Sequence, residues 1–316
     1  MATAFTFPGQ GSQATGMGQA LAGSFAAARA VFDEVDAALG QNLSRLMWEG
    51  PEADLTLTSN AQPALMAVSM AVMAVLEAEH GITVKNTAAF VAGHSLGEYS
   101  ALAAAGTFSL TDAARLLKTR GLAMQSAAPA GTGAMAALLG LDFATASLVA
   151  EEAAQGDVCQ AANDNSDGQV VVSGHKAAVE RALEIAKAKG AKRAILLPVS
   201  APFHCTLMQP AAEVMAEALA SVTMMAPVVP VVANVGASPL SDPVAIRHSL
   251  VAQVTGTVRW RECVAFMAAH EVTRFCEIGT GRVLTGLLKK NAPTATGLAI
   301  GTPDDITAAA AQFSQG

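Results

Sequence analysis

The sequence predicts an α/β fold in which a mostly parallel sheet carries a small inserted subdomain. Short apolar strands alternate with helices along most of the 316 residues, which is typical of a parallel sheet covered on both faces. In the middle of the chain the order changes to β-α-β-β-α-β, the pattern of a ferredoxin-like unit. We therefore expect residues 1–127 and 200–316 to form the main domain and residues 128–199 to form the insertion.

The main domain is expected to begin with a strand at Phe5–Pro8, a glycine-rich loop and a helix at Ala26–Leu39. The apolar stretch Ala64–Leu76 predicts a buried helix that starts near Ser59-Asn60, and its 13 residues are too few to span a bilayer. The later expected elements are the strands Ala88–Ala92, Pro230–Ala233 and Arg274–Ile278, and the helices Leu110–Ser126 and Val283–Lys290.

The insertion is bounded by two turn-rich stretches, Pro129-Ala130-Gly131-Thr132-Gly133 and Ser200-Ala201-Pro202. A cleft between it and the main domain is the natural place for a substrate. The expected elements are the strands Ala134–Leu141, Val158–Ala162, Gln169–Ser173 and Ala194–Pro198, and the helices Phe143–Ala154 and Ala177–Lys189.

Composition excludes several classes of protein. Hydrophobic residues make up 52% of the chain and charged ones 14%, which excludes a disordered protein, and the net charge of −7 argues against general nucleic-acid binding. The four cysteines are widely separated, as expected of free thiols in a reducing cytoplasm and not of a metal site. Because Met1-Ala2-Thr3-Ala4 lacks the features of a signal peptide, we expect a cytoplasmic protein without a membrane segment.

The stretch Gly93-His94-Ser95-Leu96-Gly97, after a strand and before a helix, is typical of the nucleophile elbow of α/β-hydrolase-like enzymes. Such a turn is strained and needs small neighbours, which Gly93 and Gly97 provide. The backbone N–H of Leu96 at the helix start is a ready oxyanion donor. The alternative, a serine that only caps a helix, is disfavoured by the strand-turn-helix context.

A nucleophilic serine needs a base, and His204 lies where the chain returns from the insertion to the main domain. From its position alone, His204 could equally be a loop histidine without a catalytic role. His94 is expected to be structural, because neighbouring side chains in a sharp turn point apart. Asp164 and Asp167 lie inside the insertion, so neither is a convincing partner for the imidazole. A backbone carbonyl can orient the ring and leaves no trace in the sequence.

Two further features have alternative readings. Gly9-x-Gly11-x-x-Ala14 matches a dinucleotide fingerprint, but no acidic residue ends a second strand at the required distance, so we expect this loop to bring a backbone N–H to an active site. Arg120 ends an alanine-rich helical segment in a chain with few charges, and a guanidinium binds carboxylates through two hydrogen bonds. The alternative, that Arg120 is an ordinary surface arginine, is left open by the sequence.

The motifs occur in an order that resembles malonyl-CoA:acyl-carrier-protein transacylases of bacterial fatty-acid synthesis, over nearly the whole chain. The residues that carry the resemblance are Phe7-Pro8-Gly9-Gln10-Gly11-Ser12-Gln13, Gly93–Tyr99, Arg120-Gly121, Met124-Gln125, Gly131–Met135, Asn163, Asn165, Gln169-Val170-Val171, Phe203-His204 and Gly281-x-Val283-Leu284.

The resemblance implies that Ser95 attacks the thioester of malonyl-CoA while His204 takes its proton, with the backbone N–H groups of Gln10 and Leu96 holding the oxyanion. It implies that a main-chain carbonyl near Gln253 orients the histidine and that Arg120 clamps the malonyl carboxylate. Malonyl-CoA and the phosphopantetheine of acyl carrier protein would be substrates, so no cofactor or metal is expected in what we expect to be a monomer. The substrate-binding residues are expected to be Arg120, Gln253, Asn163 and Phe203.

The carrier protein of this family is acidic, so docking on an acidic chain requires a local cationic patch. Candidates are Lys187, Lys189, Lys192 and Arg193, or Lys289-Lys290, although a solvated helix face is an equal alternative. Three other functions stay open: a carboxylesterase or thioesterase that uses water, a non-catalytic binding module, and a nucleotide-binding oxidoreductase.

Overall fold

A computed structural model describes residues 2–129, 131–199 and 201–313. Ala130 and Ser200 lie outside the described residues, and so do both ends of the predicted main domain, Met1 and 314–316. Because Ser200 is where the second segment of the main domain is predicted to begin, the division of the chain into domains stays a prediction.

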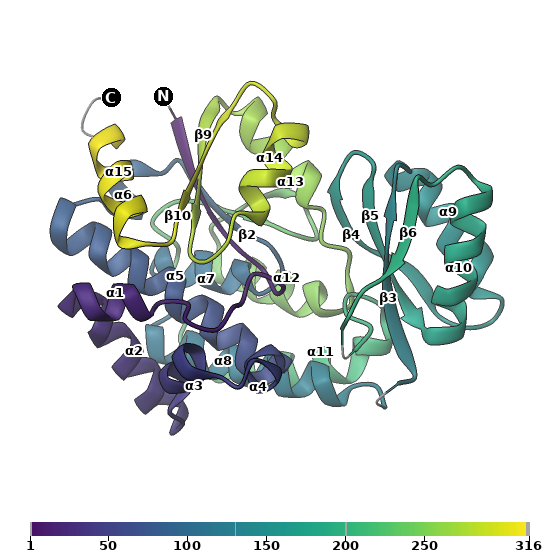
Figure 1. The fold of residues 1–316 in the computed structure, drawn as a ribbon, viewed down its shortest axis with the longest axis horizontal. Helices are drawn as coiled ribbons and strands as arrows, with labels where there is room; N and C mark the ends of the chain where they lie inside the picture. Colours follow the sequence, from purple (N-terminus) through teal and green to yellow (C-terminus); the bar gives the residue numbers. More distant parts are fainter. Residues whose placement is uncertain (1, 130, 200, 314–316) are drawn as a thin grey trace.

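The main sheet has six strands: β1 (Ala2–Phe7), β2 (Phe90–Gly93), β7 (Val231–Ala233), β8 (Ser238–Leu240), β9 (Val272–Ile278) and β10 (Thr296–Ile300). Their spatial order is β10-β9-β1-β2-β7-β8. Figure 1 labels β10, β9 and β2 of this sheet. All neighbouring strands are parallel except β8, which is antiparallel to β7. The predicted mostly parallel sheet is therefore confirmed.

Apolar side chains cover both faces of this sheet, as the sequence predicts. Phe5 and Val91 belong to one buried cluster, whereas their neighbours Ala4 and Ala92 belong to a second cluster on the opposite face. The helices that pack around the sheet are α1 (Gln19–Ser24), α2 (Ala26–Leu39), α3 (Leu43–Glu49), α4 (Glu52–Thr56), α5 (Thr58–His80), α6 (Val84–Thr87), α7 (Gly97–Ala104), α8 (Leu110–Ser126), the 3₁₀ helix η1 (Thr206–Met208), α11 (Gln209–Ala220), α12 (Pro243–Thr255), α13 (Trp260–Ala269), α14 (Val283–Asn291) and α15 (Pro303–Phe313).

Helix α5 differs from its prediction in length. It runs for 23 residues, and among the described residues it is the one helix long and apolar enough to cross a membrane. Its apolar window is 78% buried inside the protein, as in the core helix of a globular domain. Helix α8 packs closely against it, because a Cβ on Gly121 would lie 2.6 Å from the Cα of Ser59. The predicted buried helix is therefore confirmed, although the full helix, unlike its apolar stretch alone, is not too short to span a bilayer.

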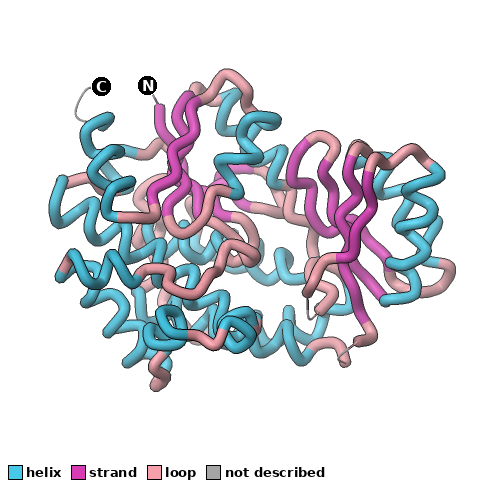
Figure 2. Tube along the Cα trace, in the orientation of Figure 1, coloured by secondary structure: helices cyan, strands magenta, loops and turns pink. Residues whose placement is uncertain are grey.

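The second sheet has four antiparallel strands in the order β4-β5-β3-β6, which is the ferredoxin-like arrangement. It lies beside the main sheet, and its two helices cover one face (Figure 2). Its elements are β3 (Gly133–Leu139), α9 (Phe143–Ala154), β4 (Cys159–Ser166), β5 (Gln169–His175), α10 (Lys176–Ala188) and β6 (Arg193–Leu196). The predicted elements are all present, with ends that differ by a few residues.

Candidate active site

The turn between β2 and α7 holds Ser95 in the left-handed region, at a φ of 53°. Such a conformation is strained for a non-glycine residue and is typical of functional sites. A Cβ on Gly93 would lie 1.8 Å from the carbonyl carbon of Gly97, and one on Gly97 would lie 2.2 Å from the backbone oxygen of Phe7. Only glycine fits at both positions, so the small flanking residues allow the elbow.

The imidazole of His204 connects the serine to the backbone of α12. Its Nε2 lies 2.8 Å from the Oγ of Ser95, although 109 positions separate the two residues. Its Nδ1 donates to the carbonyl oxygen of Gln253 at 2.9 Å and lies 3.2 Å from that of Gly256. These carbonyls assign the proton to Nδ1, because a carbonyl can only accept. Nε2 is therefore free to take the serine proton, and a backbone carbonyl replaces an acidic partner.

Burial is the main reason that the pKa of His204 falls to about 3, and the charge of Arg120 lowers it further. The imidazole is consequently neutral at physiological pH. A neutral ring is the form that a general base requires.

Arg120 is 1% exposed, so the alternative of a surface arginine is wrong. Its Nη1 donates to the Oε1 of Gln62 at 2.9 Å, and its Nη2 donates to the Oγ of Ser95 at 3.1 Å and to the Oε1 of Gln253 at 2.9 Å. In the described part of the chain its Nε has no hydrogen-bond partner and no carboxylate forms an ion pair with it. A buried cation that forms no direct ion pair, beside a nucleophile, is suited to bind an anionic group.

Ser95, Arg120 and His204 line one cavity of about 520 Å³ between the main sheet and the four-stranded sheet. Gln10 from the loop after β1 and Leu96 at the start of α7 also line it. Neither of their backbone N–H groups donates to another group of the described residues, so both are available to an oxyanion. The small sheet contributes Asn163, and the loop before His204 contributes Phe203.

His94, which the sequence predicts to be structural, also lines the cavity beside Ser95. The Nε2 of His94 lies 2.8 Å from the Oδ1 of Asn165, on β4 of the small sheet. Burial lowers the pKa of His94, so this contact is made by a neutral ring. The residue is therefore a link between the elbow and the small sheet.

Residues 4–299 match the model of a family described as acyl transferase domain. The chain belongs to this acyltransferase family. It is 47% identical to the malonyl CoA-acyl carrier protein transacylase of Salmonella typhimurium, over 98% of this chain and 99% of the relative. Its structure is similar to that of an acyl-carrier-protein-S-malonyltransferase from Bartonella henselae, with a TM-score of 0.97, 56% identity and coverage of 99% and 100%. It also resembles a malonyl-transacylase solved in complex with a type II PKS acyl-carrier protein, with a TM-score of 0.95, 43% identity and the same coverage.

Gln253 does not line the cavity of this acyltransferase, although the sequence predicts contact with the substrate. Its side chain is fully buried, accepts from Arg120 and donates to the carbonyl oxygen of Ser95 at 3.0 Å. We therefore assign it to positioning of the arginine, the serine and the histidine.

Sequence reasoning missed two buried residues behind the acyltransferase elbow. The side chain of Asn234 accepts from the N–H of Ser95 at 2.8 Å and donates to the carbonyl of Gly93 at 2.7 Å. The carboxyl of Glu98 accepts from the backbone N–H of Asn234 at 3.0 Å. Asn234 directly follows β7, which pairs with β2, and polar residues at the carboxyl ends of parallel strands are a recognisable signal. Glu98 is a charged residue in an otherwise apolar helix.

Two other sequence features have different positions relative to the acyltransferase site. The Oδ2 of Asp164 pairs with the Nη2 of Arg261 at 2.8 Å and so does not orient His204. The glycine-rich loop that resembles a dinucleotide fingerprint lines the cavity around Ser95. Among the residues that the structure describes, no three histidine, cysteine or acidic side chains gather as metal ligands.

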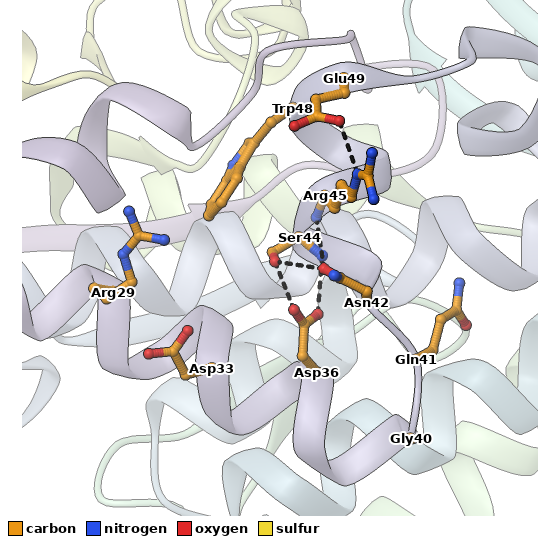
Figure 3. A pocket seen from close by; sticks show the side chains of 10 residues that line it. All are labelled: Arg29, Asp33, Asp36, Gly40, Gln41, Asn42, Ser44, Arg45, Trp48 and Glu49. Atoms are coloured by element: carbon orange, nitrogen blue, oxygen red, sulfur yellow. Dashed lines mark hydrogen bonds and ion pairs between the residues drawn. The ribbon is translucent and has the colours of Figure 1, made fainter.

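A second hollow, of about 600 Å³, lies on the surface formed by α2 and α3 (Figure 3). Its polar groups bind one another: Asp36 accepts from the N–H of Ser44 at 2.9 Å, and Arg45 pairs with Glu49 at 2.8 Å. None of the predicted site residues lines it. The chemistry therefore points to the smaller cavity around Ser95.

Proposed function

We propose that this acyltransferase moves the malonyl group of malonyl-CoA to the phosphopantetheine thiol of acyl carrier protein, as a step of fatty-acid synthesis. The observation that carries the proposal is the shared cavity in which the Oγ of Ser95 lies 2.8 Å from His204 and 3.1 Å from Arg120. The names of the relatives support the same substrate. Malonyl-CoA joins a thioester and a free carboxylate, the two groups that these side chains fit.

In the first half-reaction, the Oγ of Ser95 attacks the thioester carbonyl while the Nε2 of His204 takes its proton. The backbone N–H groups of Gln10 and Leu96 hold the developing oxyanion, and one such donor is worth about 2.7–4 kcal/mol in a comparable hole. The carbonyl of Gln253 stabilises the imidazolium through Nδ1. When the carbon–sulfur bond breaks, the imidazolium returns the proton to the sulfur of CoA, and a malonyl ester of Ser95 remains.

The second half-reaction runs the same chemistry in reverse. The carrier thiol gives its proton to His204, its sulfur attacks the ester carbonyl, and the carbon–oxygen bond breaks. Ser95 then recovers the proton from the imidazolium. CoA and the carrier thiol are substrates, and the catalytic groups in every step above belong to this chain.

Arg120 accounts for selection of an acyl group with a carboxylate. The malonyl carboxylate supplies the counter-ion that the guanidinium lacks in the described residues. An acetyl group leaves the cation unpaired, at a cost on the order of 1–3 kcal/mol.

For the carrier protein, the structure favours Lys289 and Lys290 as the cationic patch. Both are exposed at the end of α14, the helix whose Leu284 and Leu287 line the cavity. Two of the alternative lysines are already paired, Lys187 with Glu184 at 2.7 Å and Lys189 with Glu152 at 2.9 Å. Exposed cations on a helix that reaches the cavity can steer an acidic partner toward it.

The proposal is tested by mixing the protein with malonyl-CoA in the absence of a thiol acceptor and following the release of CoA. A transferase releases about one equivalent and then stalls, because the serine ester waits for a thiol. Continued release would instead indicate a thioesterase that uses water. Adding acyl carrier protein bearing phosphopantetheine should restart the release.

A further inference from the structure

Glu98 on α7 is a fully buried carboxyl group that the proposed mechanism does not use. One of its oxygens, Oε2, accepts two hydrogen bonds: from the backbone N–H of Asn234 at 3.0 Å and from the Nε2 of Gln253 at 2.8 Å. The other oxygen, Oε1, is buried and has no partner among the described residues. A carboxyl that is half satisfied in the interior is costly, so its position calls for a reason.

The amide of Gln253 stands between this carboxyl and the guanidinium of Arg120. Its Nε2 donates to Glu98, and its Oε1 accepts from the Nη2 of Arg120 at 2.9 Å. The two buried charges therefore share one amide without forming an ion pair in the described structure. Through this arrangement Glu98 balances part of the charge of Arg120 while no acyl group is bound.

The titratable groups that act on Glu98, or respond to its charge, are Arg120 on α8, Tyr99 on α7 and Cys263 on α13. Burial raises the pKa of Tyr99 and of Cys263, so both stay neutral near pH 7 and Arg120 is the charged member. Burial also raises the pKa of Glu98 to about 7, against the opposing effects of its two hydrogen-bond donors and Arg120. The carboxyl therefore changes its charge in the physiological range, whereas His204 does not.

We propose that Glu98 is a specificity-determining residue whose carboxylate competes with the carboxylate of the acyl group for the charge of Arg120. This inference rests on the proposed function, because it requires a malonyl group at Arg120. When Glu98 is ionised, it repels a second carboxylate and weakens malonyl binding. When Glu98 is protonated, the charge of Arg120 is unbalanced and the acyl carboxylate binds more tightly. Malonyl binding is then coupled to uptake of a proton at Glu98.

The test is the ratio of kcat/KM for malonyl-CoA to that for acetyl-CoA in serine acylation, measured between about pH 6 and pH 8. The ratio cancels titration of the CoA portion, which both substrates share. The matched variant is Glu98→Gln. Both donors contact the same oxygen of Glu98, so the amide oxygen of glutamine can accept both bonds while the charge is removed.

For the wild type, we expect the ratio to fall at least about threefold from pH 6 to pH 8, as the buried negative charge forms near Arg120. For Glu98→Gln, we expect a ratio that is constant with pH and no lower than the wild-type value at pH 6. A residue that only supports the fold would instead lower activity on both substrates alike and leave the pH dependence of the ratio unchanged.

Three results would overturn the inference. The first is a wild-type kcat/KM ratio that is constant with pH, and the second is a ratio in Glu98→Gln that falls with pH as steeply as in the wild type. The third is a loss of malonyl preference in that variant at every pH. The wild-type profile decides the first point even where the variant does not fold. A wild type that is not acylated by malonyl-CoA at any pH would overturn the proposed function itself, which separates the two failures.

Discussion

The guanidinium Nη2 of Arg120 lies 3.1 Å from the Oγ of Ser95, so a buried cation and the proposed nucleophile face the same cavity. The arginine is held there by Gln62 and Gln253. A malonyl group that places its carboxylate on Arg120 brings its thioester carbonyl toward Ser95. Substrate selection and chemistry are thus coupled through one side chain.

Replacing Arg120 by alanine should lower the kcat/KM for malonyl-CoA by about 10- to 100-fold, the loss of a charge-assisted contact. Acetyl-CoA, which has no carboxylate, should be affected much less, so the relative activity on uncharged acyl groups rises. Rates of serine acylation by the two thioesters measure this. The matched control is Arg282→Ala, whose side chain is 77% exposed. An equal loss with both thioesters would contradict the clamp.

The depressed pKa of His204, about 3, predicts that the base stays active in mild acid. Ser95 labelling by an uncharged fluorophosphonate should change less than about twofold between pH 8 and pH 5. An ordinary histidine would instead lose the basic form below its pKa of 6.5, and the rate would fall about 30-fold. Glu98→Gln is the control, because it removes the other group that titrates in this range.

The lowered pKa of His204 also makes the stability of the protein depend on pH. Because the folded pKa of His204 is lower than the unfolded one, the unfolded chain binds more protons as the pH falls. His204 therefore destabilises the native state progressively from about pH 6.5 downward toward its folded pKa. The variant His204→Gln should lose less stability than the wild type between about pH 7 and pH 5 in urea titrations. An identical pH dependence in both proteins would show that the ring is not buried in its neutral form.

The elbow predicts a steric result at Gly97. A Cβ at this position would lie 2.2 Å from the backbone oxygen of Phe7, which cannot move without disturbing β1. We expect Gly97→Ala to lower the free energy of unfolding by at least about 3 kcal/mol. Gly286→Ala, in open space on α14, should change it by no more than about 1 kcal/mol. Urea denaturation of the two variants compares them, and similar values would refute the tight turn.

Docking through α14 predicts a selective effect of charge reversal. The double variant Lys289→Glu, Lys290→Glu should raise the KM for acyl carrier protein and leave that for malonyl-CoA unchanged, because the patch contacts only the protein substrate. The control is Lys187→Glu, since Lys187 is already paired with Glu184. An unchanged KM for the carrier protein in the double variant would move the docking surface to Lys192 and Arg193.

The fold could be predicted largely from local sequence, and its gaps have physical causes. Strands such as β2 are short apolar runs before turns, so they are recognisable without tertiary information. Helix α12 gives no clear helical pattern in the sequence, because exposed apolar residues such as Val244 hide its buried stripe. Helix α5 begins near the predicted Ser59-Asn60 but continues past the apolar stretch to His80, and its last turn gives no apolar signal because it is polar.

The site separates into a local part and a tertiary part. Ser95 is identified from its own turn, because the two glycines required by the geometry are adjacent in sequence. The burial of Arg120 depends on packing between distant segments, and so does the bond from His204 to the carbonyl of Gln253. Local sequence therefore does not decide the roles of Arg120 and His204, and only the resemblance implies them. The partner of His94 has the same kind of origin, because Asn165 of the small sheet gives that ring its place at the cavity.

The central claim is that acyl transfer passes through a covalent ester on Ser95, and intact mass spectrometry tests it most directly. After mixing with malonyl-CoA, the wild-type chain should gain the mass of one malonyl group, and Ser95→Ala should gain none. A malonyl adduct of equal abundance on Ser95→Ala would contradict the account.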